Sequence, residues 1–293
     1  MIDFRHLTFL ALCELKNYTK TAEFLHLTQP AITQHIQYLE NYYGGKLINL
    51  SKGNFQLTKK GNLLKHYTQI MVADSKIIFE KINNSKDASQ INFGATLTIG
   101  EFIMPQIINK IMLKNDYIHF NLIIENTKSL LNRLENSEIT FAFIEGIFDK
   151  SKYSYNLFKK ENFIAVCSPK STFAQGKHSI ENLISSKLIL REKGSGTRDI
   201  FEQILHSINL TPQSFLNVSE IGNMNAIKTL VEENCGITFL YEAAVKEELL
   251  SKKLVKIDLI NFNIKRELNF VYLKNSIHSE EYNKTFNLFK NFI

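Results

Sequence analysis

Two polar runs in the sequence carry side chains that suit binding chemistry. The first is residues 192–198, Glu-Lys-Gly-Ser-Gly-Thr-Arg, which follow the apolar residues 187–190. Glycines let backbone N–H groups converge, and a helix N-terminus beside hydroxyl groups attracts an anion. An ordinary turn from strand to helix has the same composition. Clefts form at the carboxyl ends of parallel strands, however, so this position favours a ligand site that includes Ser195, Gly196 and Thr197.

The second run, residues 28–37, has one apolar and one polar side at helical spacing. Thr28 suits the N-cap of a helix, and Pro30 is tolerated in the first turn because its missing N–H would have no partner there. Amide and hydroxyl side chains on the polar side suit hydrogen bonds to base edges and phosphates. The predicted DNA contacts are Thr28, Gln29, Pro30, Thr33, Gln34 and Gln37, with Lys20 and Lys52 outside the run.

Other predicted turns add candidates to the ligand site. Thr96 and Thr98 follow a predicted strand at 91–94, where capping the next helix is an equal alternative for them. Asn223 opens a later predicted helix and is expected to face the same cleft. Glu145 ends another apolar stretch, where it would orient the edge of the site or bind an amine. Because helix N-termini and hydroxyl donors converge here, the expected ligand is small and anionic.

The elements around the second run predict a complete domain. Residues 3–15 form an amphipathic helix that is expected to pack behind the helix pair of 17–36. Apolar segments on both sides of 51–54 predict a strand–turn–strand wing, with Lys52 placed to meet a phosphate. Residues 1–58 are therefore predicted to form a winged helix-turn-helix that binds DNA.

A long helix is expected over residues 59–84. Its apolar residues, which include Leu64, Tyr67, Met71 and Ile78, recur at spacings of three and four, although Asp74 interrupts the stripe. Such a stripe suits either a coiled-coil partner or the chain's own core. Because the preceding domain is complete without this helix, we expect residues 59–89 to act as a dimerisation helix followed by a polar hinge.

From residue 90 onward, predicted strands and helices alternate, and the alternation starts again after residue 167. This rhythm predicts mostly parallel sheet with helices on both faces. The expected fold class is therefore α/β, with the winged helix-turn-helix and linker helix first and two α/β lobes after them.

The chain resembles the LysR-type transcriptional regulators along nearly its whole length. The resemblance implies a two-lobed effector domain similar to periplasmic binding proteins, here residues 90–293. It places lobe 1 at about 90–166 and 266–293, and lobe 2 at about 167–265. The residues that carry the resemblance are Phe9, Leu10, Ala22, Leu25, Thr28–Thr33, Ile36, Leu39, Glu40, Leu57, Thr58 and Gly61, then Gly94–Thr96, Pro105, Glu145, Gly146, Gly194–Arg198, Gly236 and Ile237.

The resemblance also implies a function. A protein of this family would bind an inverted-repeat promoter site on double-stranded DNA as a homodimer or homotetramer, and a small effector between the lobes would switch its activity. The family usually has a Phe and a basic residue before the wing, where this chain has Ile48 and Leu50, and a basic residue where it has Gln34. These departures reduce the positive charge that would face DNA.

Charge and hydropathy fit this interpretation. Residues 1–88 hold 11 Lys and Arg against 7 Asp and Glu, a balance of +4, whereas the whole chain has a net charge of +6. No stretch is apolar over the roughly 18 residues that a membrane span needs, and Met1–Arg5 is unlike a secretion signal. The expected location is the cytoplasm.

Two other functions need separate consideration. A thiol redox sensor on the same fold would need Cys167 and Cys235 to meet, although both lie in or beside predicted strands. An α/β enzyme would need a catalytic motif, and the sequence has neither a nucleophile elbow nor a P-loop. Cysteine and histidine spacings predict no metal site. We therefore expect no catalytic residues and no cofactor.

Overall fold

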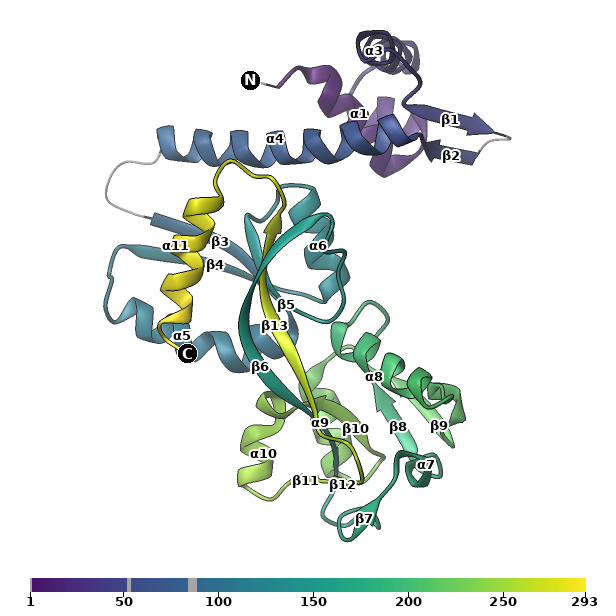
Figure 1. Ribbon diagram of the computed structural model, residues 1–293, viewed down its shortest axis with the longest axis vertical. Coiled ribbons are helices and arrows are strands. Elements are labelled where there is room, and N and C mark those ends of the chain that lie inside the picture. The colour runs from purple at the N-terminus through teal and green to yellow at the C-terminus, as the bar shows by residue number, and fades with distance from the viewer. Residues whose placement is uncertain (1, 52–53, 84–88) are drawn as a thin grey trace. The chain divides into compact units, whose positions relative to one another are not determined.

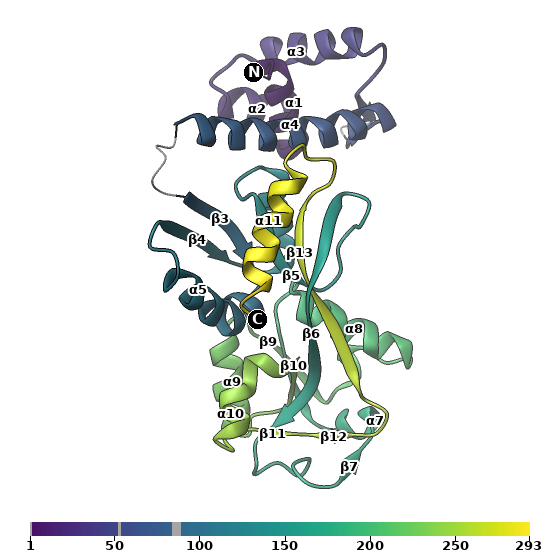
Figure 2. The same ribbon diagram turned by 60° about the vertical axis from the view of Figure 1, so that its left-hand side comes forward.

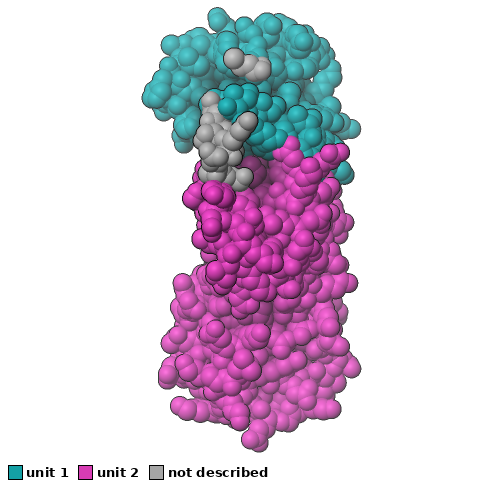
Figure 3. Space-filling model, turned by 90° about the vertical axis from the view of Figure 1, so that its left-hand side faces the viewer, with its two compact units in different colours: residues 1–86, 135–138, 273–279 teal, residues 87–134, 139–272, 280–293 magenta. Residues whose placement is uncertain are grey.

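The computed structural model describes residues 2–51, 54–83 and 89–293, which form two compact units (Figure 3). Lys52 and most of the predicted hinge lie outside the described residues. Unit 1 consists of Met1–Lys86, Glu135–Glu138 and Leu273–Ser279, and unit 2 consists of Asp87–Leu134, Ile139–Tyr272 and Glu280–Ile293.

Unit 1 begins with three helices, α1 (Phe4–Leu15), α2 (Tyr18–Phe24) and α3 (Gln29–Tyr42). The Thr28 hydroxyl caps α3 by accepting a hydrogen bond from the N–H of Ala31. The cap of α2 is Asn17, which has an extended backbone and accepts from the N–H of Lys20. The helices enclose one apolar core, whose buried members include Phe9, Leu12, Ala22, Ile32, Ile36 and Leu39.

The predicted wing is present as the antiparallel pair β1 (Ile48–Ser51) and β2 (Asn54–Leu57). Helix α4 (Lys59–Asn83) follows directly, and the hydroxyl of Thr58 accepts a hydrogen bond from the N–H of Gly61. A Cβ at Gly61 would lie 2.1 Å from the carbonyl oxygen of Leu47. Glycine is therefore required where the start of α4 crosses the wing.

Helix α4 has two different apolar faces. Leu64 belongs to the core of the three-helix domain, whereas Tyr67, Met71 and Ile78 are exposed. The single stripe expected from the sequence is wrong in this respect, because Leu64 already has a partner within its own domain. Asp74 is buried on the packed side, where its carboxylate accepts hydrogen bonds from the Ser276 hydroxyl at 2.6 Å and from the next backbone N–H.

Unit 2 contains two lobes joined by two long strands, β6 (Tyr153–Cys167) and β13 (Ile264–Leu273) (Figures 1 and 2). Lobe 1 contains β3 (Ser89–Ala95), η1 (Thr98–Ile103), α5 (Met104–Met112), β4 (Ile118–Ile124), α6 (Thr127–Glu135), β5 (Phe141–Glu145) and α11 (Ser279–Lys290). Lobe 2 contains β7 (Lys177–His178), α7 (Ile180–Leu183), β8 (Lys187–Leu190), α8 (Gly196–Ser207), η2 (Pro212–Ser214), β9 (Asn217–Glu220), α9 (Met224–Glu232), β10 (Thr238–Tyr241), η3 (Glu242–Val245), α10 (Lys246–Leu250), β11 (Val255–Lys256) and β12 (Asp258–Leu259).

The main sheet has the strand order β10-β6-β13-β5-β3-β4. Strands β3, β4 and β5 are parallel, but β13 pairs antiparallel with β5, and β10 pairs antiparallel with β6. The sheet is therefore mixed rather than mostly parallel, because the strands that cross between the lobes run against their neighbours. Phe289 of α11 packs on Phe93 and Phe143 at the centre of lobe 1.

The first helical segment after β3 is divided in two. Residues 98–103 form a π-helical turn, η1, and a regular α-helix begins only at Met104. Pro105 explains the division, because it has no N–H to donate to the carbonyl of Glu101 four residues earlier. Single π-turns occur frequently at functional sites, and this one carries Thr98 of the predicted ligand site. Within the described residues, no helix is long and apolar enough to cross a membrane.

Candidate nucleic-acid interface and ligand cleft

The polar side of α3 faces outward, as the sequence predicts. Gln29, Gln34 and Gln37 are exposed, whereas Ile32 and Ile36 on the opposite side are buried. The amide nitrogen of Gln29 donates to the hydroxyl of the residue one turn later at 3.1 Å, and that hydroxyl donates back to the Gln29 carbonyl. This arrangement holds two of the predicted DNA-contacting side chains in a fixed relation at the N-terminal end of the helix.

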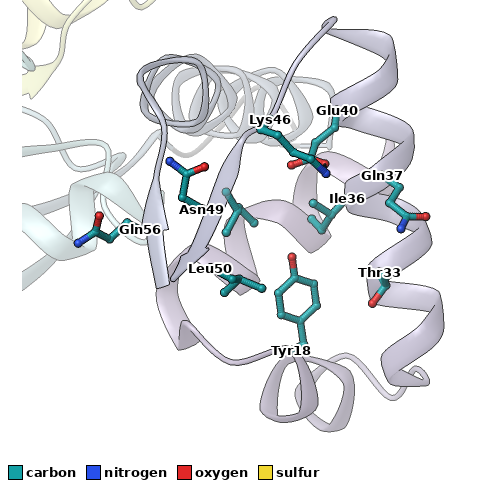
Figure 4. A pocket seen from close by; sticks show the side chains of 10 residues that line it. Tyr18, Thr33, Ile36, Gln37, Glu40, Lys46, Asn49, Leu50 and Gln56 are labelled. Atoms are coloured by element: carbon teal, nitrogen blue, oxygen red, sulfur yellow. Dashed lines mark hydrogen bonds and ion pairs between the residues drawn. The ribbon is translucent and has the colours of Figure 1, made fainter. Parts of the chain in front are cut away.

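A groove of about 610 Å³ separates α3 from the wing (Figure 4). Five polar residues that were not among the predicted DNA contacts also line it: Tyr18, Glu40, Lys46, Asn49 and Gln56. Asn49 and Gln56 are opposite each other in the wing and are both exposed. Successive side chains of a strand point to opposite faces, and this alternation along the two predicted strands could have placed Asn49 and Gln56 on one face.

The charge of this surface is low. Lys46 forms an ion pair with Glu40 at 2.7 Å, so its charge is balanced within the protein. The family resemblance implies a basic residue at the position of Leu50. The Leu50 side chain is exposed and lines the groove. Lys20 is exposed on α2. This surface therefore offers neutral amides and hydroxyls more than free cations.

In unit 2, the 192–198 run forms a close contact between the lobes. A Cβ at Gly196 would lie 2.3 Å from the carbonyl oxygen of Glu145 in lobe 1. Gly146 has a φ of +96°, and a Cβ there would lie 2.5 Å from the Cα of Gly196. The N–H of Lys128 donates to the carbonyl of Gly194 at 3.3 Å. The glycines predicted to gather backbone N–H groups thus also let the two lobes touch.

Glu145 is buried at this contact. One carboxyl oxygen accepts a hydrogen bond from the hydroxyl of Thr197 at 2.8 Å, across the contact between the lobes. The other oxygen has no hydrogen-bond partner among the described residues. Burial raises the pKa of the Glu145 carboxyl, and the hydroxyl of Thr197 opposes this shift in part. The side chain can therefore take up a proton and act as a donor toward a ligand.

Three further hydroxyls from the predicted ligand site are buried: those of Thr96, Thr98 and Ser195. By strict geometry none of the three makes a hydrogen bond within the part of the chain that the structure describes, although the Thr98 and Thr96 hydroxyls lie close enough to the Glu145 carboxyl to oppose the rise of its pKa. The N-cap residue of η1 is Leu97, and no side chain caps that helix, so the two threonines are not helix caps. Buried hydroxyls are normally hydrogen-bonded, which indicates that these are available to a bound molecule.

Asn223 and Arg198 have other contacts. The Asn223 side chain is exposed and caps α9 by accepting from the N–H of Ala226 at 2.9 Å. The Arg198 guanidinium forms ion pairs with Glu202 and Glu220. The structure thus brings together Thr96, Thr98, Glu145, Ser195, Gly196 and Thr197 of the predicted ligand site.

A second contact between the lobes was not visible in the sequence. Phe102 of η1 packs against the apolar core of lobe 2. The ammonium group of Lys228 lies 4.6 Å from the centre of the Phe102 ring and forms an ion pair with Glu248 at 2.7 Å. Burial raises the pKa of Glu101, which also experiences the positive charges of Lys228 and Arg191. This contact adds apolar burial to the hydrogen bond between the lobes.

The raised pKa of Glu145 predicts a defined pH dependence. In the unfolded chain a Glu side chain has a pKa of about 4.3. Because the folded protein holds this proton more tightly, the free energy of unfolding falls as pH rises from that value toward the folded pKa, by about 1.4 kcal/mol per pH unit. We expect Glu145→Gln to remove this fall in urea denaturation measured from acid to neutral pH. Identical slopes for the two proteins would contradict the prediction.

The cysteine environments oppose a thiol sensor. Cys167 is buried at the end of β6, and burial raises the pKa of its thiol to about 11. Cys235 is exposed, and both thiols are free. A thiol with so high a pKa reacts slowly because the thiolate is the nucleophile.

Comparison with known proteins agrees with both parts of the structure. The family model of the bacterial regulatory helix-turn-helix protein, lysR family, matches residues 5–62, and that of the LysR substrate binding domain matches residues 84–292. The chain is 26% identical to the HTH-type transcriptional regulator CysL of Bacillus subtilis over 272 residues. The aligned region covers 90% of this chain and 89% of CysL.

Two solved structures are similar in fold. The Corynebacterium glutamicum OxyR C206 mutant has a TM-score of 0.62 and 20% identity, with 98% of this chain and 90% of that chain covered. The regulatory domain of Synechocystis PCC6803 CcmR in complex with 2-PG has a TM-score of 0.60 and 21% identity, with coverage of 67% and 95%. A winged helix-turn-helix joined to a two-lobed substrate-binding domain defines an effector-responsive transcriptional regulator. The chain belongs to the LysR family of these regulators.

Proposed function

We propose that this regulator works in the cytoplasm as a homodimer that binds an inverted-repeat promoter site, and that a small anionic effector in the cleft of unit 2 switches its activity. The effector is bound and released unchanged. The observation that carries the proposal is the group of buried hydroxyls at the cleft. Thr96, Thr98 and Ser195 come from both lobes, and none of their hydroxyls makes a hydrogen bond of regular geometry to another described residue. A ligand that accepts their hydrogen bonds would favour the closed arrangement of the lobes.

Similar proteins support a small ligand for this domain. The regulatory domain of CcmR was solved in complex with 2-PG, and the effector binding domain of QuiR in complex with shikimate. In this chain, the N-terminus of α8 and the hydroxyls beside it supply partial positive charge. Protonated Glu145 would add a further donor.

The exposed face of α4 supports a dimer. Leu63, Tyr67 and Met71 are exposed there, and they line an apolar groove of about 350 Å³ together with Tyr43, Leu47, Lys60 and Leu64. Spacings of four residues place the three exposed side chains on one side of the helix. A second copy of α4 would cover this surface and would present two reading helices to two half-sites.

Changing Ser195 to glutamate tests the effector site. The new carboxylate would fill the space beside the buried hydroxyls and repel an anion, so the transcriptional response to inducer should be lost. DNA binding without effector should remain, because α3 belongs to unit 1. The measurements are a reporter response in cells and the gel-shift affinity of the purified protein.

A matched control is Ser207→Glu, at the exposed end of the same helix. It adds the same charge to α8 and should leave the response intact. A Ser195→Glu protein with the wild-type response would exclude this cleft as the effector site.

Replacing Gln34 by alanine tests the reading helix. If Gln34 contacts a base edge, its loss should cost about 1–3 kcal/mol at the specific site and much less on random DNA. Fluorescence anisotropy with both DNA probes measures the difference. Gln106→Ala, an exposed glutamine in unit 2, is the control and should change neither affinity. Equal losses on both probes would assign Gln34 to the phosphate backbone instead.

A further inference from the structure

Arg191 is a buried cation close to the contact between the lobes. It follows β8 at the carboxyl end of the strand, and only 2% of its surface is exposed. Its Nε and Nη2 donate to the two carboxyl oxygens of Glu192 at 2.8 and 2.9 Å. Glu192 also accepts from Asn126 of lobe 1, and the Arg191 carbonyl accepts from Arg198. The guanidinium is therefore held firmly by one of its edges.

The remaining nitrogen of this guanidinium, Nη1, is buried and has no partner among the residues that the structure describes. A guanidinium group cannot lose its charge to avoid this cost, since it stays protonated in proteins. Leaving such a donor unsatisfied in the interior is expensive. An oxyanion beside Nη1 would satisfy it with a charge-assisted hydrogen bond.

Arg191 lies within electrostatic range of the ligand-site residues of lobe 1. Its charge acts on the carboxyl groups of both Glu145 and Glu101. The Ser195 hydroxyl, four residues further along the chain, is also buried without a partner within the described part of the molecule. A fixed guanidinium edge and an uncommitted hydroxyl from lobe 2 thus accompany Glu145 from lobe 1.

The surrounding charges limit the charge of the ligand. Glu192 balances Arg191, Glu248 balances Lys228, and Glu101 adds a partly buried carboxylate. These five groups together carry no excess of positive charge. A dianion would therefore meet repulsion, whereas a single negative charge can be held by directed hydrogen bonds.

We propose that Nη1 of Arg191 and the hydroxyl of Ser195 bind the head group of the effector, and that this head group is a monovalent oxyanion such as a carboxylate or sulfonate. The inference rests on the proposed function, because it names the class of ligand that enters the same cleft. It adds Arg191 as the residue that selects a ligand with a single negative charge.

Isothermal titration calorimetry of the full chain tests this assignment with glycolate, methanesulfonate and inorganic phosphate as probes. Mildly alkaline buffer keeps phosphate in its dianionic form. Glycolate and methanesulfonate should bind the wild-type protein more tightly than phosphate does. Arg191→Gln should weaken both by about tenfold or more, the effect of losing one charge-assisted hydrogen bond. Glu192→Gln should strengthen both by roughly threefold, because it relieves repulsion and loosens the competing ion pair.

The Glu192 variant keeps the test independent of folding, since a gain in affinity cannot come from a damaged protein. Arg133→Gln is the matched control, because Arg133 pairs with Glu125 through the same two nitrogens on lobe 1. It should leave all affinities unchanged. Equal affinities of wild type and Arg191→Gln, tighter binding of phosphate, or no binding of either monoanion would overturn the inference. Binding that depends on Arg191 but never alters DNA affinity would instead overturn the proposed function.

Discussion

Replacing both Tyr67 and Met71 by glutamate is expected to turn the regulator into a monomer and to lower its affinity for an inverted-repeat site by about 100-fold or more. Both side chains are exposed on α4, at 47% and 43% of their surface, and both line its apolar groove. The two new glutamates of each protomer would place four negative charges in the dimer interface, where they would repel each other. Without the pair, each half-site is bound separately, and the gain from linked binding is lost.

Sedimentation velocity and DNA titration measure the two effects. The control is Leu216→Glu with Leu250→Glu, which adds the same charge at two exposed apolar residues of unit 2. That protein should remain a dimer. Leu64 is unsuitable for the test because it is buried in the helical core, where glutamate would unfold the domain. A dimer that survives both changes on α4 would place the interface on another surface.

Adding one methyl group at Gly196 should disrupt the contact between the lobes. The new Cβ would lie 2.3 Å from the Glu145 carbonyl oxygen and 2.7 Å from the hydroxyl of Thr127. One of the opposing groups is backbone and cannot rotate away, so the lobes must separate. The hydrogen bond from Thr197 to Glu145 would then be lost. We expect Gly196→Ala to lower the free energy of unfolding by about 1–3 kcal/mol and to abolish the effector response.

Gly222→Ala is the control, because a Cβ there would meet only Glu192 atoms at 3.7 Å or more. It lies in the same lobe and should be close to neutral in urea denaturation. A Gly196→Ala protein with wild-type stability and a normal response would show that the close approach of the lobes is unnecessary for function.

Much of unit 1 was predictable because its determinants are local. Thr28, Pro30 and the apolar spacing of Ile32 and Ile36 define α3 within a single stretch of sequence, and the structure confirms this helix. The cap of α2 was not predictable, since Asn17 and Thr19 both have a suitable side chain. Only the backbone conformation at Asn17 decides between them.

The ligand cleft was predictable in part. Residues 192–198 and Glu145 stood out because glycines and polar groups follow strands. Their close approach was not predictable, since contact between Gly196 and Glu145 depends on how two lobes fold back on each other. A role for Arg191 was not predictable for a related reason, because an Arg followed by a Glu in the sequence is usually a solvent-exposed ion pair. Its burial is a property of the folded lobe.

The sequence alone determined the family, helix α3, the two-lobed plan and the lengths of most helices, because periodicity, caps and glycine positions act over a few residues. The tertiary structure alone decided which apolar side of α4 is covered and why Asp74 is tolerated there, since its partners lie about two hundred positions away in the chain. It also decided which hydroxyls at the cleft lack partners. Such contacts link distant segments, and no local pattern encodes them.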